Sequence, residues 1–198
     1  MRHFLDIKDF DRERLSSLLD TARDMKSGHD VGQPLNGLHI GMIFEKPSTR
    51  TRVSFEVGIS QLGGTPVFLA ASDLQLGRGE TVGDTAKVLS RYLDGIMIRA
   101  MKHETLTELV KHATVPVING LTDRSHPCQI LADLQTVIEH HGSLKNEVIV
   151  WFGDGNNVAN SWIEAAALFG FELRLVGPEA YHPSAELIAW ALEKGANI

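Results

Sequence analysis

The sequence predicts an α/β fold with two doubly wound domains built on mainly parallel sheets. Short apolar runs typical of buried strands alternate with stretches of helical period along the chain. After the turn-like stretch HHGSLKN a second strand and helix series begins, which predicts domains at residues 1–142 and 143–198. The second stretch is shorter than the usual domain of roughly 100 residues. We therefore expect that domain to be incomplete within these 198 residues.

The elements follow one another in a regular order. A first helix, capped by Asp9 or Asp11, is predicted by apolar residues at helical spacing: Leu15, Leu18, Leu19, Ala22 and Met25. Strands are predicted at residues 35–45, 65–70, 94–100, 115–120, 147–152 and 171–177. Helices are predicted at residues 47–64, around residues 85–92, at 104–113 and 127–141, after the GDGNN loop, and in SAELIAWALEK. The last residues, KGANI, resemble the entry to another strand, so we expect further residues or another chain to complete the sheet.

Composition excludes several classes of protein. With 43% hydrophobic and 22% charged residues the chain is of ordinary globular type. Its formal charge of −6 argues against a nucleic-acid or acidic-membrane partner, because those require a basic face. One cysteine permits no internal disulfide, and the charged start MRHFLDIKDFDRERL lacks the apolar core of a signal peptide. These two features lead us to expect a cytoplasmic protein. No apolar run approaches the roughly 20 residues of a membrane span.

The stretch FEKPSTRTRVSFE has the composition of an anion site. It lies where a predicted strand passes to a helix, and first-turn amides of such a helix favour a phosphate. Ser48, Thr49 and Thr51 add hydroxyl donors, and Arg50 adds a planar guanidinium. Capping alone would explain Ser48 or Thr49. Five consecutive donors at the carboxyl end of a strand are more than capping requires, which favours a ligand.

The two arginines of this stretch have different predicted roles. Residues i and i+2 of a helix point in different directions, so one phosphate is not expected to hold both. Arg52 lies four residues before Glu56, which favours an ion pair on the helix surface. Arg50 is therefore the predicted ligand.

A second candidate cluster is RSHPCQILADLQ. Pro127 suits the first position of a helix, which puts His126 just before that helix and Gln129 in its first turn. Cys128 is interpreted as a packed residue, because no base is evidently placed to activate it. Arg99 ends another predicted strand, so three strand ends are expected to present these groups in one crevice. That combination suits a small dianion attached to a carbonyl group.

The loop FGDGNNVANS carries half of a dinucleotide fingerprint. Val158 stands where a third glycine is required, and the following strand ends without an acidic residue for a ribose hydroxyl. A nicotinamide oxidoreductase is therefore disfavoured, and no cofactor is expected. Asp154, Asn156 and Asn157 face a crevice or simply make the turn. The nine histidines show no metal-ligand spacing, so no metal is expected.

Taken together, FEKPSTRTRVSFE, DGIMIRA, HPCQILADLQT and GDGNNVANS resemble the aspartate/ornithine transcarbamylase family, and within it the ornithine carbamoyltransferase branch. The resemblance runs in order over nearly the whole chain. It implies transfer of the carbamoyl group of carbamoyl phosphate to the side-chain amine of L-ornithine, giving citrulline and phosphate in arginine biosynthesis or its reverse. It also implies a homotrimer or a multiple of it.

The resemblance further assigns residues. Those implied to bind carbamoyl phosphate are Ser48, Thr49, Arg50, Thr51, Gln75 reaching into a neighbouring subunit, Arg99, His126 and Gln129. Among these, Arg99, His126 and Thr51 are implied to be catalytic as stabilisers of the developing oxyanion. Asn157 matches an ornithine-contacting position.

Other interpretations stay open at this point. The family's later motifs for the amino acid have no counterpart before Ile198, so the chain alone is expected to bind carbamoyl phosphate but to transfer it poorly. One alternative is a transcarbamylase for aspartate or another amine. Another is a non-catalytic carbamoyl-phosphate-binding fragment.

Overall fold

The computed structural model describes residues 3–70, 72, 74 and 79–198. Contacts divide the chain into a first unit, Met1–Leu5 with Asp30–Asp123, and a second unit, Asp6–His29 with Arg124–Ile198. The predicted boundary at residue 142 stays a prediction. By contacts, the N-terminal helix α1 (Arg12–Lys26) and α5 (Pro127–His141) both belong to the second unit.

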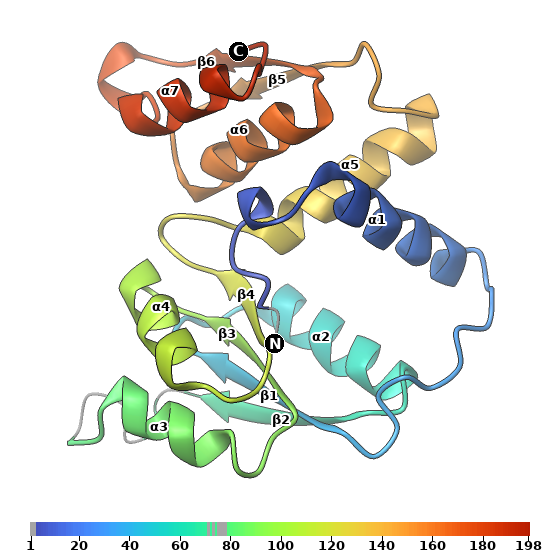
Figure 1. Cartoon of the computed structure of the whole chain (residues 1–198), viewed down its shortest axis with the longest axis vertical. Coiled ribbons are helices and arrows are strands. Elements are labelled where there is room, and N and C mark those ends of the chain that lie inside the picture. The colour runs from blue at the N-terminus through green and yellow to red at the C-terminus, as the bar shows by residue number, and fades with distance from the viewer. Residues whose placement is uncertain (1–2, 71, 73, 75–78) are drawn as a thin grey trace. The chain divides into compact units, whose positions relative to one another are not determined.

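A four-stranded parallel sheet organises the first unit (Figure 1). Its strands are β1 (His39–Phe44), β2 (Thr65–Ala70), β3 (Gly95–Arg99) and β4 (Val117–Leu121). Their order is β2-β1-β3-β4, and every pairing is parallel. The register sets Phe44 opposite Arg99, so β1 and β3 end side by side.

Helices cover both faces of this sheet. Because strand side chains alternate between faces, Ile43, Ile96 and Ile98 pack towards α3 (Val82–Leu89) and α4 (His103–His112). A second set of strand residues, Met42, Phe44 and Met97, packs with Ile59 of α2 (Thr49–Gln61). A three-layer α/β arrangement of this kind confirms the predicted fold class.

The second unit combines helices with a two-stranded parallel sheet. Its strands are β5 (Val148–Phe152) and β6 (Glu172–Val176), followed through the helix η2 (Glu179–Tyr181) by α7 (Ala185–Glu193). The helix α6 (Asn157–Phe169) contacts α5, α7 and the short N-terminal helix η1 (Ile7–Asp9). Most of its residues are buried, and Trp162 lies edge-on to Phe171 at 5.8 Å between ring centroids. Such a pattern is typical of a helix at the centre of a core.

Most predicted elements are confirmed, and their ends have local causes. Asp11, one of the two predicted caps, accepts a hydrogen bond from the Arg14 backbone N–H at 2.7 Å and starts α1. Pro127 begins α5, and Gly142, in a left-handed conformation, ends it. The helix around residues 85–92 was placed too far towards the C-terminus, because α3 begins at Val82, ends at Leu89 and leaves the exposed Tyr92 outside it.

No helix among the described residues combines the length and the apolar character that a membrane span requires.

Gly155 shows why the GDGNN loop needs a glycine there. A Cβ placed on it would lie 2.6 Å from the Cα of Pro183 and 2.7 Å from the carbonyl carbon of His182. Its N–H also donates to the Tyr181 carbonyl at 2.6 Å. The backbone of residues 181–183 therefore passes directly over this glycine, which accounts for it without a dinucleotide.

We predict that Gly155→Ala lowers the free energy of unfolding by about 1–3 kcal/mol, because backbone atoms cannot yield to the added methyl group. Urea denaturation followed by circular dichroism measures the change. Gly58→Ala is the control: this helical glycine has no atom within 4 Å of its Cβ position, so that variant should be as stable or up to about 1 kcal/mol more stable. Equal stability of the two variants would contradict the prediction.

Candidate functional site

The junction between β1 and α2 has the geometry of an anion site. Ser48 is the N-cap residue of α2, and its hydroxyl accepts a hydrogen bond from the Thr51 N–H at 3.4 Å. The backbone N–H groups of Thr49 and Arg50 have no partner among the described residues. Arg50 itself is exposed and makes no ion pair within the described part of the chain. Free amides at a helix N-terminus beside a free guanidinium favour a phosphate.

Thr51 and Arg99 meet at this junction. The Arg99 Nη1 group donates to the Thr51 hydroxyl at 3.3 Å, and Ser48 donates to the same oxygen at 3.0 Å. With two donors on its oxygen, Thr51 keeps its own O–H available for a further acceptor. The Arg99 Nε is buried and has no partner among the described residues, and burial lowers the pKa of Arg99 from its usual value. A guanidinium stays charged despite such a shift, so Arg99 holds a positive charge with an unused donor.

Arg52 has a different environment, as predicted. Its Nε lies 3.3 Å from Glu56 Oε2, which confirms the expected ion pair. Its guanidinium also stacks on the Phe68 ring of β2, 3.7 Å from the ring centroid. These groups line a cavity of about 500 Å³ together with Phe44, Pro47, Ser48, Thr49 and Val53. Arg52 thus ties the first turn of α2 to the sheet.

The HPCQ residues lie in the second unit at the start of α5. His126 is the N-cap residue, and its backbone N–H donates to the Ser161 hydroxyl at 3.0 Å. Gln129 is exposed in the first turn and donates through Nε2 to Asp133 Oδ1 at 2.8 Å. Burial raises the pKa of the Cys128 thiol to about 12, so almost no thiolate exists at neutral pH. This agrees with the interpretation of Cys128 as a packed residue.

The GDGNN loop makes a local turn. Asn156 caps α6 by accepting from the N–H groups of Val158 and Ala159 at 2.9 and 3.2 Å, and its amide donates to Asp154 at 2.8 Å. Two of the three polar groups considered for a crevice therefore serve the turn. Asn157 is the first residue of α6.

The structure thus brings three predicted residues into direct contact, namely Ser48, Thr51 and Arg99, with Thr49 and Arg50 in the same helical turn. His126, Gln129 and Asn157 are placed at helix starts within the second unit. Gln75 lies outside the described residues. Within the described part of the chain, no group of three or more His, Cys, Asp or Glu residues has the arrangement of a metal site.

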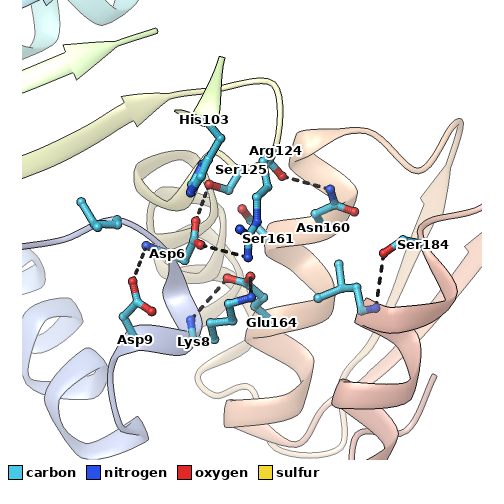
Figure 2. Close-up of polar contacts among 12 residues, drawn as sticks. Asp6, Lys8, Asp9, His103, Arg124, Ser125, Asn160, Ser161, Glu164 and Ser184 are labelled. Atoms are coloured by element: carbon cyan, nitrogen blue, oxygen red, sulfur yellow. Dashed lines mark hydrogen bonds and ion pairs between the residues drawn. The ribbon is translucent and has the colours of Figure 1, made fainter. Parts of the chain in front are cut away.

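One cluster was missed by the sequence reasoning. Figure 2 shows Asp6, Lys8, Arg124 and Glu164 together in the second unit. Glu164 is 2% exposed, with Lys8 Nζ at 3.5 Å and the Lys8 backbone N–H at 3.3 Å. Asp6, also buried, accepts from the Ser125 hydroxyl and lies 3.7 Å from Arg124. The only signal in the sequence is a single acid inside the apolar helix pattern SWIEAAALF.

Comparison with known proteins identifies the family. Residues 2–139 match the family described as aspartate/ornithine carbamoyltransferase, carbamoyl-P binding domain. Residues 145–198 match its Asp/Orn binding domain. The chain belongs to the aspartate/ornithine carbamoyltransferase family. The sequence motifs therefore pointed to the correct family.

Individual members of this family are closely similar to the chain. The ornithine carbamoyltransferase of Cereibacter sphaeroides is 50% identical over all of this chain and 67% of its own length. The anabolic ornithine carbamoyltransferase of Pseudomonas aeruginosa is 53% identical over 96% of this chain and 64% of its own length. The solved structure of ornithine carbamoyltransferase from Pyrococcus furiosus superimposes with a TM-score of 0.94 at 47% identity, over 99% of this chain and 65% of that one. The chain thus spans about two thirds of the length of these relatives.

The buried Glu164 predicts a specific pH dependence of stability. Burial, with a smaller contribution from the Asp6 charge, raises the pKa of Glu164 from 4.5 to about 7. Between pH 4.5 and about 7, Glu164 in the folded chain therefore keeps a proton that the unfolded chain has released. The contribution of this group to stability is therefore present below about pH 4.5 and is lost as the pH rises to about 7.

We predict that Glu164→Gln raises the urea midpoint relative to the parent chain at pH 8, and that the difference shrinks towards pH 5 as the parent's Glu164 takes up its proton. Urea denaturation at four pH values between these limits measures it. Glu164 and Glu186 line one cavity of about 380 Å³, but Glu186 is exposed. Glu186→Gln is therefore the matched control. A difference that stays constant with pH would show that Glu164 titrates normally.

Proposed function

We propose that this chain binds carbamoyl phosphate and serves the transfer of its carbamoyl group to the side-chain amine of L-ornithine, giving L-citrulline and phosphate. The observation that carries the proposal is the strand edge where the free amides of α2 lie beside the Thr51–Arg99 contact. Support for the substrates comes from the two matched family domains and from relatives named ornithine carbamoyltransferase.

The phosphate is assigned to the first turn of α2. The N–H groups of Thr49 and Arg50 and the positive end of the helix dipole meet the phosphate oxygens, with the Ser48 and Thr51 hydroxyls beside them. The Arg50 guanidinium is free to make a bidentate contact. All of these donors are present before the ligand arrives, so little reorganisation accompanies binding.

The carbamoyl group is assigned to Arg99, Thr51, His126 and Gln129. Attack of a neutral amine on the carbamoyl carbon builds negative charge on the carbonyl oxygen, and donors held ready for that charge lower the barrier. Arg99 with its unused Nε donor and Thr51 with its available O–H suit this role. His126 is assigned as a further donor to the oxygen, and Gln129 as the partner of the carbamoyl nitrogen, on the HPCQ motif.

No protein nucleophile takes part in the proposed reaction. Nitrogen of the amine bonds to the carbamoyl carbon, and the carbon–oxygen bond to phosphate breaks. The nitrogen loses one proton to the departing phosphate, whose charge is met by Arg50 and the α2 amides. The acceleration then comes from holding two substrates in line and from the oxyanion donors. The protonated state of Cys128 is consistent with this route.

The remaining assignments also belong to the proposal. We assign Asn157 to the ornithine site and Gln75 to the site of a neighbouring subunit, and we propose a homotrimer or a multiple of it as the assembly. We also propose a cytoplasmic location, which the single cysteine of these 198 residues supports, because one cysteine permits no internal disulfide.

The first test is amine specificity. We predict that a form of the protein as long as its relatives, incubated with carbamoyl phosphate, releases phosphate and forms citrulline with L-ornithine, and does not form carbamoyl aspartate with L-aspartate. Mass spectrometry of the products distinguishes the two. A preference for aspartate would show that aspartate, and not ornithine, is the amine substrate. Binding of carbamoyl phosphate without product from either amine would indicate a binding fragment.

The second test separates the two arginines of the STRTR stretch. We predict that Arg50→Ala weakens carbamoyl phosphate binding about 10- to 100-fold, the loss of a charge-assisted contact, without lowering the thermal midpoint. Arg52→Ala should leave the affinity within about twofold but reduce stability by roughly 0.5–1 kcal/mol, because it removes the Phe68 stacking. Isothermal titration and thermal unfolding measure both. Equal losses of affinity with intact folding would contradict the division of roles.

A further inference from the structure

The Gln129 side chain is held in one orientation by a neighbour on its own helix. Gln129 Nε2 donates to Asp133 Oδ1 at 2.8 Å, across one turn of α5. Asp133 is half-buried, whereas Gln129 is exposed. Both residues lie on α5.

The chemistry of the pair fixes which end of the amide is used. An ionised carboxylate only accepts hydrogen bonds, so it must face the NH₂ end of a glutamine amide and never its oxygen. With NH₂ turned to Asp133, the Oε1 atom is the end of Gln129 left for a ligand. A free glutamine would present either end, and half of those presentations would offer a donor where an acceptor is needed.

We infer that Asp133 is a positioning residue that presents Gln129 Oε1 as an acceptor for the NH₂ group of the carbamoyl substrate, and thereby selects carbamoyl phosphate over acyl phosphates that lack an N–H. The inference rests on the proposed function, in which Gln129 meets the carbamoyl nitrogen.

Acetyl phosphate is the informative competitor. It has the same phosphate and carbonyl groups as carbamoyl phosphate, but a methyl group replaces the NH₂. In a site that presents a fixed acceptor, the methyl group leaves that acceptor without its hydrogen bond, and the ligand binds less tightly. Inorganic phosphate has no carbonyl substituent, so its affinity is independent of the orientation of Gln129.

A second pair on α5 supplies the comparison with a purely structural role. Gln135 Nε2 donates to Glu139 Oε1 at 3.1 Å with the same spacing of four residues. Pairs of this kind stabilise helices modestly wherever they occur. Glu139 also pairs with Lys26 at 2.7 Å, so its removal affects stability through two contacts. If Asp133 had a purely structural role, its removal would likewise affect stability and would leave the choice between ligands unchanged.

The experiment measures dissociation constants for carbamoyl phosphate, acetyl phosphate and inorganic phosphate by isothermal titration. The variants are Asp133→Asn, which can bond to either end of the amide, and Asp133→Glu, which keeps an acceptor-only group. Glu139→Gln removes an equal charge from the same helix as the control. Asp133→Ala, with the higher helix propensity, is used if the asparagine variant does not fold. Thermal unfolding checks every variant.

We expect the parent chain to prefer carbamoyl phosphate to acetyl phosphate, and Asp133→Asn to reduce that preference about five- to tenfold. Asp133→Glu should restore most of it, Glu139→Gln should not change it, and the affinity for inorganic phosphate should stay constant throughout. A preference that survives in folded Asp133→Asn and Asp133→Ala, or that is absent from the parent chain, overturns the role of Asp133. Failure of the parent chain to bind carbamoyl phosphate at all instead overturns the proposed function.

Discussion

The pairing of Phe44 with Arg99 across β1 and β3 is the constraint on which the anion site depends. Because of this pairing, β1 and β3 end side by side at the same edge of the sheet. The Glu45 N–H, one residue after β1, donates to the Arg99 carbonyl at 3.0 Å. The chain then turns at once into α2, so the first turn of that helix begins beside the Arg99 side chain. A shift of one residue in this register would turn Arg99 to the opposite face of the sheet. Thr51 and Arg99 would then no longer meet, whatever their chemical suitability.

Rigidity of the first turn of α2 comes from residues that do not bind the proposed ligand. Arg52 stacks on Phe68 and pairs with Glu56, while Phe68 lies 5.5 Å from Phe44, centroid to centroid. One side of the turn is therefore fixed to β2, and the other presents Thr51 to β3. Preorganised amides are effective because their dipoles need not be turned during binding. The second arginine of the STRTR stretch thus contributes to the site through geometry rather than contact.

Local sequence signals predicted most elements because each has a local cause. Pro127 and Gly142 define the ends of α5, and Asp11 begins α1, without help from distant residues. The prediction failed where tertiary contacts decide. Tyr92 continues an apolar spacing but lies beyond α3. The buried acids Asp6 and Glu164 influence each other although they are 158 positions apart in the sequence, so no local stretch of sequence reveals them. The contact of Thr51 with Arg99 was predictable only in outline, since parallel strands share an edge but their register depends on the fold.

In the proposed site, charge recognises the phosphate and hydrogen-bond direction recognises the carbamoyl group. The phosphate is recognised by charge, through the amides of α2 and through arginines, in a chain whose net charge of −6 would otherwise repel it. Such attraction is strong but indiscriminate among phosphates, and salt weakens it. The carbamoyl group is uncharged, so only the direction of hydrogen bonds distinguishes it from its analogues, and that direction is insensitive to salt. Selectivity therefore requires side chains fixed in orientation, and the Asp133–Gln129 contact provides such fixation within a single helix.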